Sequence, residues 1–181
     1  MSRLFRPWLI VALLTLVYAL LVVAIKGSPL ALVTVGSRFS VESYNYSEEG
    51  YDGQFVYFIA RDPAGASELI TRGGDIPAYR FQRILLPGLG WLASFGGQDA
   101  LVPWALLLIN LAALAGGTWA LQQLLHDYRI SQWYALGYGL SLTVLAATRL
   151  SLTEPLAYGL VVGGLLLAKR EHWGWSAVMF A

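Results

Sequence analysis

Carboxylates and arginines are the side chains best suited to chemistry in this 181-residue chain. The chain contains no cysteine. The lack of cysteine excludes thiol catalysis, thiolate metal sites and disulfide bonds. His126 and His172 have no second metal ligand nearby, and neither a Walker A loop nor a His-Glu-x-x-His pattern occurs. We therefore expect the polar chemistry in segment 26–100. It contains eight of the eleven acidic residues: Glu42, Glu48, Glu49, Asp52, Asp62, Glu68, Asp75 and Asp99.

Two carboxylates stand out by their positions. Asp52 precedes Gly53 at the start of a segment with helical periodicity, and Glu154 precedes Pro155 in a short turn between apolar segments. An ionisable residue at the edge of a membrane span is a candidate for a functional site. Each carboxylate also has a structural alternative. Asp before Gly is an ordinary turn or helix-cap signal, and an acid beside Pro155 complements a helix dipole.

The composition of the chain indicates an integral membrane protein. Hydrophobic residues make up 57% and charged residues only 13%, with a formal net charge of +1. Soluble domains are usually about a quarter charged, so a soluble globular domain is disfavoured. Nucleic-acid binding would require clustered Lys and Arg, which this charge balance does not provide. The expected partners are therefore membrane lipids and no nucleic acid.

Uncharged windows predict the membrane spans, because about 20 apolar residues cross the hydrocarbon core. Three windows, 7–25, 100–125 and 130–148, have 19, 26 and 19 residues without a charge, and window 155–168 has 14. The last reaches spanning length if its helix starts near Ser151. The first could instead be a cleaved signal peptide, although its apolar core is longer than usual and no small-x-small site follows. The predicted spans are 8–25, 101–125, 131–149 and 152–168, with the start of a fifth at 173–181.

The distribution of cations predicts which side of the membrane each loop occupies. If the N-terminus is inside, the short outer turn carries Arg149 alone. This assignment satisfies the positive-inside rule and makes segment 26–100 an outer loop. Segment 84–98 is uncharged but short and rich in glycine, so we expect it to lie at the interface rather than to cross. The inner segments carry Arg3, Arg6, Arg129, Lys169 and Arg170.

Two amphipathic helices are expected in the outer loop. Residues 51–60 form the first, with Asp52 as its N-cap. Its face carrying Phe55, Phe58 and Ile59 is expected to pack onto the membrane domain or lipid. The second runs from Pro77 to Ala93, and its basic start and apolar content suit the headgroup plane.

The order of these features resembles the GT-C superfamily of polytopic glycosyltransferases, and most closely bacterial members related to mannosyltransferases of the GPI-anchor pathway. The shared features are an N-terminal span, a long outer loop with Tyr-Asp-Gly-Gln-Phe, an Arg…Leu-Leu-Pro stretch before the second span, and an outer Leu-Thr-Glu-Pro turn. The resemblance covers nearly the whole chain but only the N-terminal portion of such enzymes, so we expect these 181 residues to need further helices for activity and the assay to require the full-length protein. It implies an all-α, polytopic fold in the bacterial inner membrane, with the N-terminus cytoplasmic and the first loop periplasmic.

The resemblance also implies a reaction and roles for particular residues. The reaction is transfer of a sugar from a polyprenyl-phosphate-linked donor to an acceptor on the outer side. Asp52 matches an acid that serves as catalytic base or helps to hold a divalent metal ion, and Glu154 matches the acid of the outer turn. One departure is Gly53, which leaves Asp52 without an adjacent second acid. The substrate-binding residues then expected are Tyr51, Gln54, Arg80, Arg83 and Arg149.

Other interpretations of these residues remain open. Arg80 and Arg83 could equally attract anionic lipid headgroups. A transporter subunit would place ionisable groups at mid-membrane depth, whereas the acids here lie mostly in one outer loop. A non-catalytic membrane assembly module is the remaining alternative. If Asp52 and Glu154 serve one site, their carboxylates should face a common groove about one substrate's width apart, since closer carboxylates raise one another's pKa.

Overall fold

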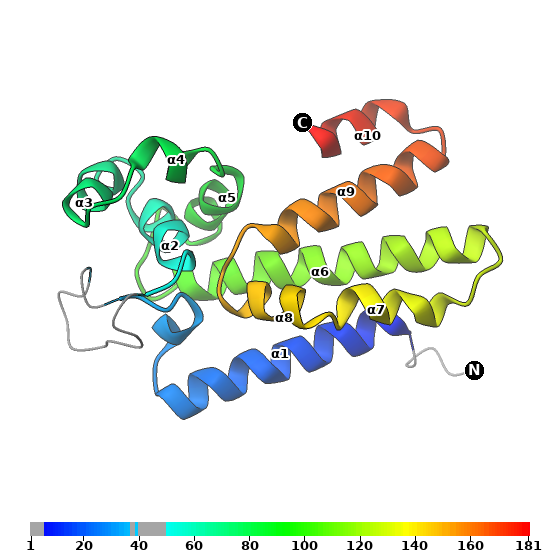
Figure 1. The fold of residues 1–181 in the computed structure, drawn as a ribbon, viewed down its shortest axis with the longest axis horizontal. Coiled ribbons are helices and arrows are strands. Elements are labelled where there is room, and N and C mark those ends of the chain that lie inside the picture. The colour runs from blue at the N-terminus through cyan, green and yellow to red at the C-terminus, as the bar shows by residue number, and fades with distance from the viewer. Residues whose placement is uncertain (1–5, 37–38, 40–49) are drawn as a thin grey trace. The chain divides into compact units, whose positions relative to one another are not determined.

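The computed structural model describes residues 6–36, 39 and 50–181 (Figure 1). Within these residues every regular element is a helix and no strand occurs, so the predicted all-α class is confirmed for the described part of the chain. Four residues used in the sequence argument lie outside the described residues: Arg3, Glu42, Glu48 and Glu49.

The chain divides into two compact units, each of which is described here by itself. The first unit comprises residues 1–18, 110–148 and 154–181, and the second comprises 19–109 and 149–153. The expected outer loop, 26–100, therefore lies entirely within the second unit. The short turn 149–153, which the charge pattern assigns to the same side, belongs to that unit as well.

Two helices, α1 (Pro7–Lys26) and α6 (Val102–Asp127), are long and apolar enough to cross a membrane, judged by length and composition. Their bounds lie within two residues of the predicted spans 8–25 and 101–125. In the first unit, Val11 of α1 packs against Leu114 and Val144. In the second, Ala19 packs against Leu32, the last residue of the short helix η1 (Pro29–Leu32), and Leu107.

The segment expected to form one span over 131–149 is divided into three short helices. These are η2 (Gln132–Tyr134), α7 (Ala135–Gly139) and α8 (Leu142–Arg149). Glycine destabilises helix interiors, and Gly137 and Gly139 both precede the break. Ser141 then starts a new helix, because its hydroxyl accepts a hydrogen bond from the Val144 amide at 3.4 Å.

Small residues allow close helix packing in the rest of the first unit. A Cβ at Gly117 of α6 would lie 3.0 Å from the Cα of Gly159 in α9 (Glu154–Lys169). Helix α10 (Trp173–Phe180) packs on α9, where the Ser176 hydroxyl donates to the Gly164 carbonyl at 2.9 Å. The close approach expected of membrane-type helices is therefore present at these glycines.

The core of the second unit is built by α2 (Gly53–Arg61) and α3 (Ala66–Arg72). Phe55 and Ile59 of α2 pack against Ala66 and Ile70 of α3, with Phe39 and Phe81 at the edge. The expectation that this face of α2 packs onto the membrane domain or lipid is therefore wrong for Phe55 and Ile59. The physical reason is α3, a helix from the same loop that the sequence patterns did not predict.

The single helix expected over 77–93 is also divided. It forms α4 (Pro77–Phe81) and α5 (Leu85–Ala93), separated by residues 82–84 (Figure 1). Helix α5 packs on α2 through a glycine, since a Cβ at Gly90 would lie 3.2 Å from that of Ala60 and 2.7 Å from the Leu106 side chain of α6. Packing against α3 and α5 thus holds α2 in place within the second unit. Asp52 directly precedes the N-terminal end of this helix.

Candidate functional site

Asp52 directly precedes α2, at the position the sequence predicted, but its side chain does not cap that helix. Its backbone is helical, with φ −55° and ψ −28°, whereas a capping side chain usually requires an extended backbone. The carboxylate instead accepts a hydrogen bond at Oδ1 from Nη1 of Arg80, at 3.0 Å. The Asp52 side chain is 60% exposed, so it is both oriented and accessible.

Arg80 of α4 is held from three sides. Its Nε and Nη2 donate to Oδ2 of Asp75 at 3.1 and 2.7 Å. Its guanidinium carbon lies 3.9 Å from the ring centroid of Phe55, a cation–π contact. Only 17% of the Arg80 side chain is exposed. Burial disfavours the charge, but the Asp75 hydrogen bonds and the charges of Asp52 and Asp75 outweigh it and raise the pKa of Arg80.

Asp75 completes this ion-pair cluster. Its Oδ1 accepts the Ile76 amide at 2.6 Å, and its side chain is 26% exposed. The hydrogen bond from Arg80 lowers the pKa of the Asp75 carboxyl below its ordinary value, against an opposing contribution from burial. We did not single out Asp75 from the sequence. The available signal was its position five residues before Arg80, at the start of α4.

Tyr51 and Gln54 attach the start of α2 to the segment that follows η1. The Tyr51 amide donates to the Thr34 carbonyl at 3.1 Å. Gln54 is buried, and its Oε1 accepts the Gly36 amide at 2.9 Å. Gln54 therefore uses its amide oxygen to hold the backbone, while the exposed Tyr51 side chain is the better placed of the two for substrate contact.

The turn 149–153 joins the same region. The buried Ser151 hydroxyl donates to the Leu32 carbonyl at 3.1 Å, and Nη1 of Arg149 donates to Oγ1 of Thr34 at 3.3 Å. Gly53, the first residue of α2, lies so close to the turn that a Cβ there would overlap the Leu150 carbonyl oxygen. The turn therefore lies against the start of α2 through Leu150, with Arg149 bonded to the segment that follows η1.

Two further arginines, Arg83 and Arg149, contribute positive charge to the site. Arg83 is exposed, and its Nη1 lies 3.5 Å from Oγ1 of Thr153. Arg149 is half-buried, and among the described residues its buried Nε has no hydrogen-bond partner. We call the following residues the α2 N-terminal cluster: Asp52, Asp75, Arg80, Arg83 and Arg149. Its three arginines are cations of the kind that bind an anionic group such as a phosphate.

Glu154 belongs to the first unit, where it is the half-buried first residue of α9. Its negative charge lies at the positive end of that helix dipole, an arrangement that stabilises a helix without further chemistry. The expected common groove for Asp52 and Glu154 stays a prediction, because the two residues lie in different units.

The residues near Asp52 do not fit a divalent metal ion. Its partner is the cationic guanidinium of Arg80, which takes the place that a metal would occupy at Oδ1. Across residues 6–36, 39 and 50–181, no group of three or more His, Asp or Glu side chains could hold a metal ion. We therefore derive no step that uses a metal at Asp52.

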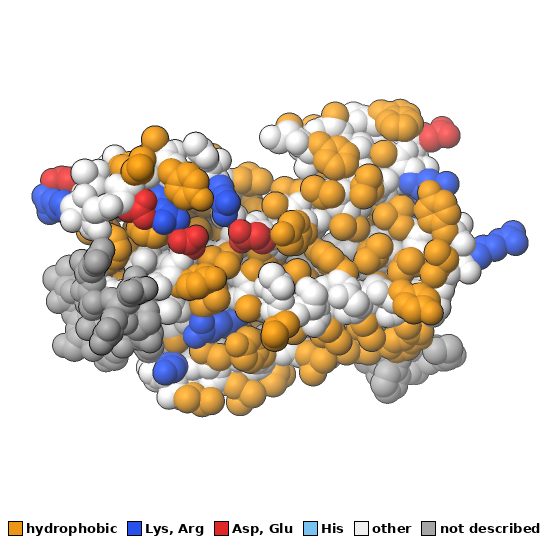
Figure 2. All heavy atoms as spheres, in the orientation of Figure 1, with side chains coloured by type: hydrophobic (Ala, Val, Ile, Leu, Met, Phe, Trp, Pro, Cys, Tyr) orange, Lys and Arg blue, Asp and Glu red, His pale blue; other side chains and the backbone are white. Residues whose placement is uncertain are grey.

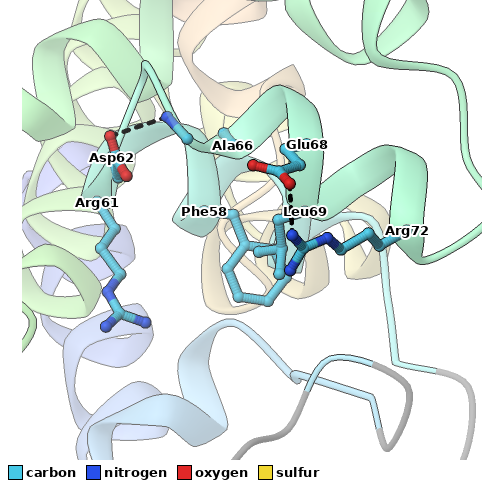
Figure 3. Close-up of a pocket in the computed structure, with 8 residues that line it drawn as sticks. Phe58, Arg61, Asp62, Ala66, Glu68, Leu69 and Arg72 are labelled. Atoms are coloured by element: carbon cyan, nitrogen blue, oxygen red, sulfur yellow. Dashed lines mark hydrogen bonds and ion pairs between the residues drawn. The ribbon is translucent and has the colours of Figure 1, made fainter.

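A separate pocket of about 270 Å³ lies between α2 and α3, at the other end of α2 (Figure 3). Its charged groups already have partners: Arg72 pairs with Glu68, Arg61 pairs with Asp99, and Asp62 accepts the Gly65 amide. The lining itself carries two arginines and two acids, so the pocket has no net charge to attract an ionic ligand. Its lining is Phe58, Arg61, Asp62, Gly65, Ala66, Glu68, Leu69 and Arg72.

Comparison with other proteins adds no identification to this geometry. No protein-family model matches the chain, and searches of curated proteins and of solved structures found no match. The case for the α2 N-terminal cluster therefore rests on its residues and their contacts.

Proposed function

We propose that this protein is a membrane glycosyltransferase. It transfers a sugar from a polyprenyl-phosphate-linked donor to an acceptor hydroxyl on the outer side of the bacterial inner membrane. The observation that carries the proposal is the exposed Asp52 carboxylate, which accepts a hydrogen bond from Arg80. The resemblance of the sequence to GT-C glycosyltransferases supplies the class of donor.

The membrane location is supported by the surface of the apolar helices. Helix α1 exposes large side chains that lipid would cover, among them Leu13 at 60%, Leu21 at 55% and Ile25 at 79%. Figure 2 shows hydrophobic side chains over much of the visible surface of α6 and α9, while charged side chains gather over α2 to α5. In the proposed topology the N-terminus is cytoplasmic and segment 26–100 is periplasmic.

Asp52 acts as the general base in this proposal. As the acceptor oxygen attacks the anomeric carbon, its proton passes to the Asp52 carboxylate. The bond between the anomeric carbon and the phosphate oxygen breaks, and polyprenyl phosphate leaves with the bonding electrons. A single displacement of this kind requires one base and inverts the configuration of the sugar.

The phosphate gains negative charge as it leaves, and a cation near it stabilises that charge. We assign this role to Arg83, which is exposed and whose Nη1 lies beside the Thr153 hydroxyl. Arg149 supports it from the turn. Arg80 is already engaged by two carboxylates, so we assign it to Asp52 rather than to the donor.

A non-catalytic membrane assembly module is the second candidate. It is favoured by the same ion-pair cluster, because one arginine between two carboxylates also occurs where it only stabilises a fold. In that case the cluster is needed for stability, and the protein transfers no sugar from any donor.

The test is sugar transfer from labelled polyprenyl-phosphate sugars in membranes that contain the protein. We expect transfer by the wild type and a decrease of about 100-fold or more in Asp52→Asn. Asp62→Asn is the matched control, since Asp62 is an exposed aspartate at the other end of α2, and it should retain activity. Glu154→Gln tests the role that the resemblance implies for that acid. Absence of transfer by the wild type, or full activity of Asp52→Asn, would contradict the proposal.

A further inference from the structure

Asp75 has no part in the proposed reaction, yet it makes three hydrogen bonds within the cluster. Its Oδ2 accepts from both Nε and Nη2 of Arg80, and its Oδ1 accepts the Ile76 amide. These contacts use both oxygens of the carboxylate and one edge of the guanidinium, the edge formed by Nε and Nη2. Since Asp75 lies two residues before the start of α4 and Arg80 lies within that helix, the two side chains form one local unit.

The orientation of the Arg80 guanidinium determines which of its nitrogens faces Asp52. With Nε and Nη2 engaged by Asp75, the remaining nitrogen, Nη1, faces Oδ1 of Asp52 at 3.0 Å. The Phe55 ring, 3.9 Å from the guanidinium carbon, restricts the group further. A guanidinium is a planar fork with fixed donor directions, so fixing one edge fixes the other.

We propose that Asp75 and Arg80 form a positioning pair that holds the Asp52 carboxylate in the orientation required to accept the proton of the acceptor. This inference rests on the proposed function of Asp52. Neither residue of the pair touches the reacting atoms; both act through Asp52. The arrangement is useful because an exposed side chain that exchanges freely among its rotamers spends little time in a reactive geometry.

Kinetics on the protein in its native membrane provide the first test. Misplacement of a reacting group by about 1 Å costs about 100-fold, so Arg80→Gln should lower kcat by about that factor and Asp75→Asn by about 10-fold. KM for the lipid-linked donor should stay within about twofold, because the pair does not bind the donor. Arg80→Lys should recover only part of the loss, because an ammonium lacks the fork. An increase in KM with unchanged kcat would overturn the inference.

A matched pair at the other end of α2 is the control. Arg61 and Asp99 form an Arg–Asp ion pair at 2.6 Å, outside the α2 N-terminal cluster. Arg61→Gln and Asp99→Asn should leave kcat and KM unchanged. If these variants lower kcat as much as Asp75→Asn does, the effect is general destabilisation of the second unit and the inference fails.

Chemical labelling of Asp52 tests the positioning without measuring activity. A water-soluble carbodiimide and an amine modify exposed carboxyl groups, and mass spectrometry reports the rate at Asp52. Loss of the orienting pair should increase that rate several-fold in both Arg80→Gln and Asp75→Asn. An unchanged or slower rate in Asp75→Asn would show that Arg80 is held without Asp75 and would overturn the inference. If the wild type transfers no sugar, the proposed function fails while the labelling still decides whether the pair orients Asp52.

Discussion

The two ends of α2 carry the same types of charged side chain in different surroundings. At the N-terminal end, Arg80 is 17% exposed and lies between Asp52 and Asp75. At the C-terminal end, Arg61 and Asp99 are 48% and 61% exposed. The Glu68–Arg72 pair at the neighbouring pocket is more exposed still (Figure 3).

This difference separates an ion pair that fixes a geometry from one that does not. Exposed pairs contribute about 0 to 1 kcal/mol, since water and salt screen them and both side chains lose freedom. A guanidinium withdrawn from water has lost hydration, so it depends on the carboxylates that replace it. The contrast explains why we place the site at the N-terminal end of α2 and not at the pocket.

Among these variants, removal of the half-buried Arg80 guanidinium should lower the stability most. Arg80→Met leaves Asp52 and Asp75 without their common partner, and we expect the free energy of unfolding to fall by about 3 kcal/mol. For a chain of this size that is a decrease in Tm of about 6 to 12 °C in detergent micelles. Arg61→Met is the control, and it should lower the stability by less than about 1 kcal/mol. Equal losses would remove the distinction between the two ends.

A matched pair of glycines gives the next largest effect. A Cβ at Gly53 would overlap the backbone carbonyl of Leu150, whereas a Cβ at Gly65 would meet the movable Asp62 side chain. Gly53→Ala should therefore lower the free energy of unfolding by about 2 kcal/mol, and Gly65→Ala by less than half of that. Denaturant unfolding followed by tryptophan fluorescence measures both. A larger loss for Gly65→Ala would show that the turn 149–153 does not lie tightly against α2.

The pH dependence of stability should distinguish Asp75 from the exposed acids. The hydrogen bond from Arg80 lowers the pKa of Asp75 in the folded protein, so its contribution is complete above the unfolded-state pKa of about 4. That contribution is lost as the pH falls through the lower, folded-state value. Asp75→Asn should therefore be less stable than the wild type by about 1 kcal/mol at pH 7, and the difference should shrink below about pH 4. A difference that is constant from pH 7 to pH 3 would contradict this assignment.

The exposed helical pair should give the smallest effect. Glu68 and Arg72 lie one turn apart on α3, and both side chains are more than two-thirds exposed. Glu68→Gln should change the free energy of unfolding by less than about 0.5 kcal/mol, and added salt should reduce the change further. A loss comparable with that of Asp75→Asn would mean that exposure does not separate the two kinds of pair.

The sequence predicted those parts of the fold that depend on local composition. Helices α1 and α6 follow from the uncharged windows, because length and apolar content alone determine whether a helix can span lipid. The division of 131–149 was not predicted, since a count of charges is insensitive to Gly139 and to the Ser141 cap that starts α8. The packing of α2 on α3 was likewise missed because it depends on a tertiary partner.

The position of Asp52 at the start of α2 was predicted, but its contacts were not. Asp52 lies at the start of α2 as expected, and its neighbours Tyr51 and Gln54 are local. Its pairing with Arg80, 28 residues away, depends on how α4 folds back on α2. No periodicity in the sequence encodes that contact. The contribution of Asp75 follows only once Arg80 is placed, so sequence reasoning identified the carboxylate but not what orients it.

The turn 149–153 determines when the second unit can be completed during synthesis. Ser151 bonds to Leu32 across 119 residues, and Arg149 bonds to Thr34 across 115. At about 5 to 20 residues per second, a ribosome needs about 6 to 24 s to travel from one partner to the other. Throughout that interval α2 has been made while the residues that cover Gly53 have not. The N-terminal end of α2 therefore reaches its final form only after α6, α7 and α8 have been synthesised.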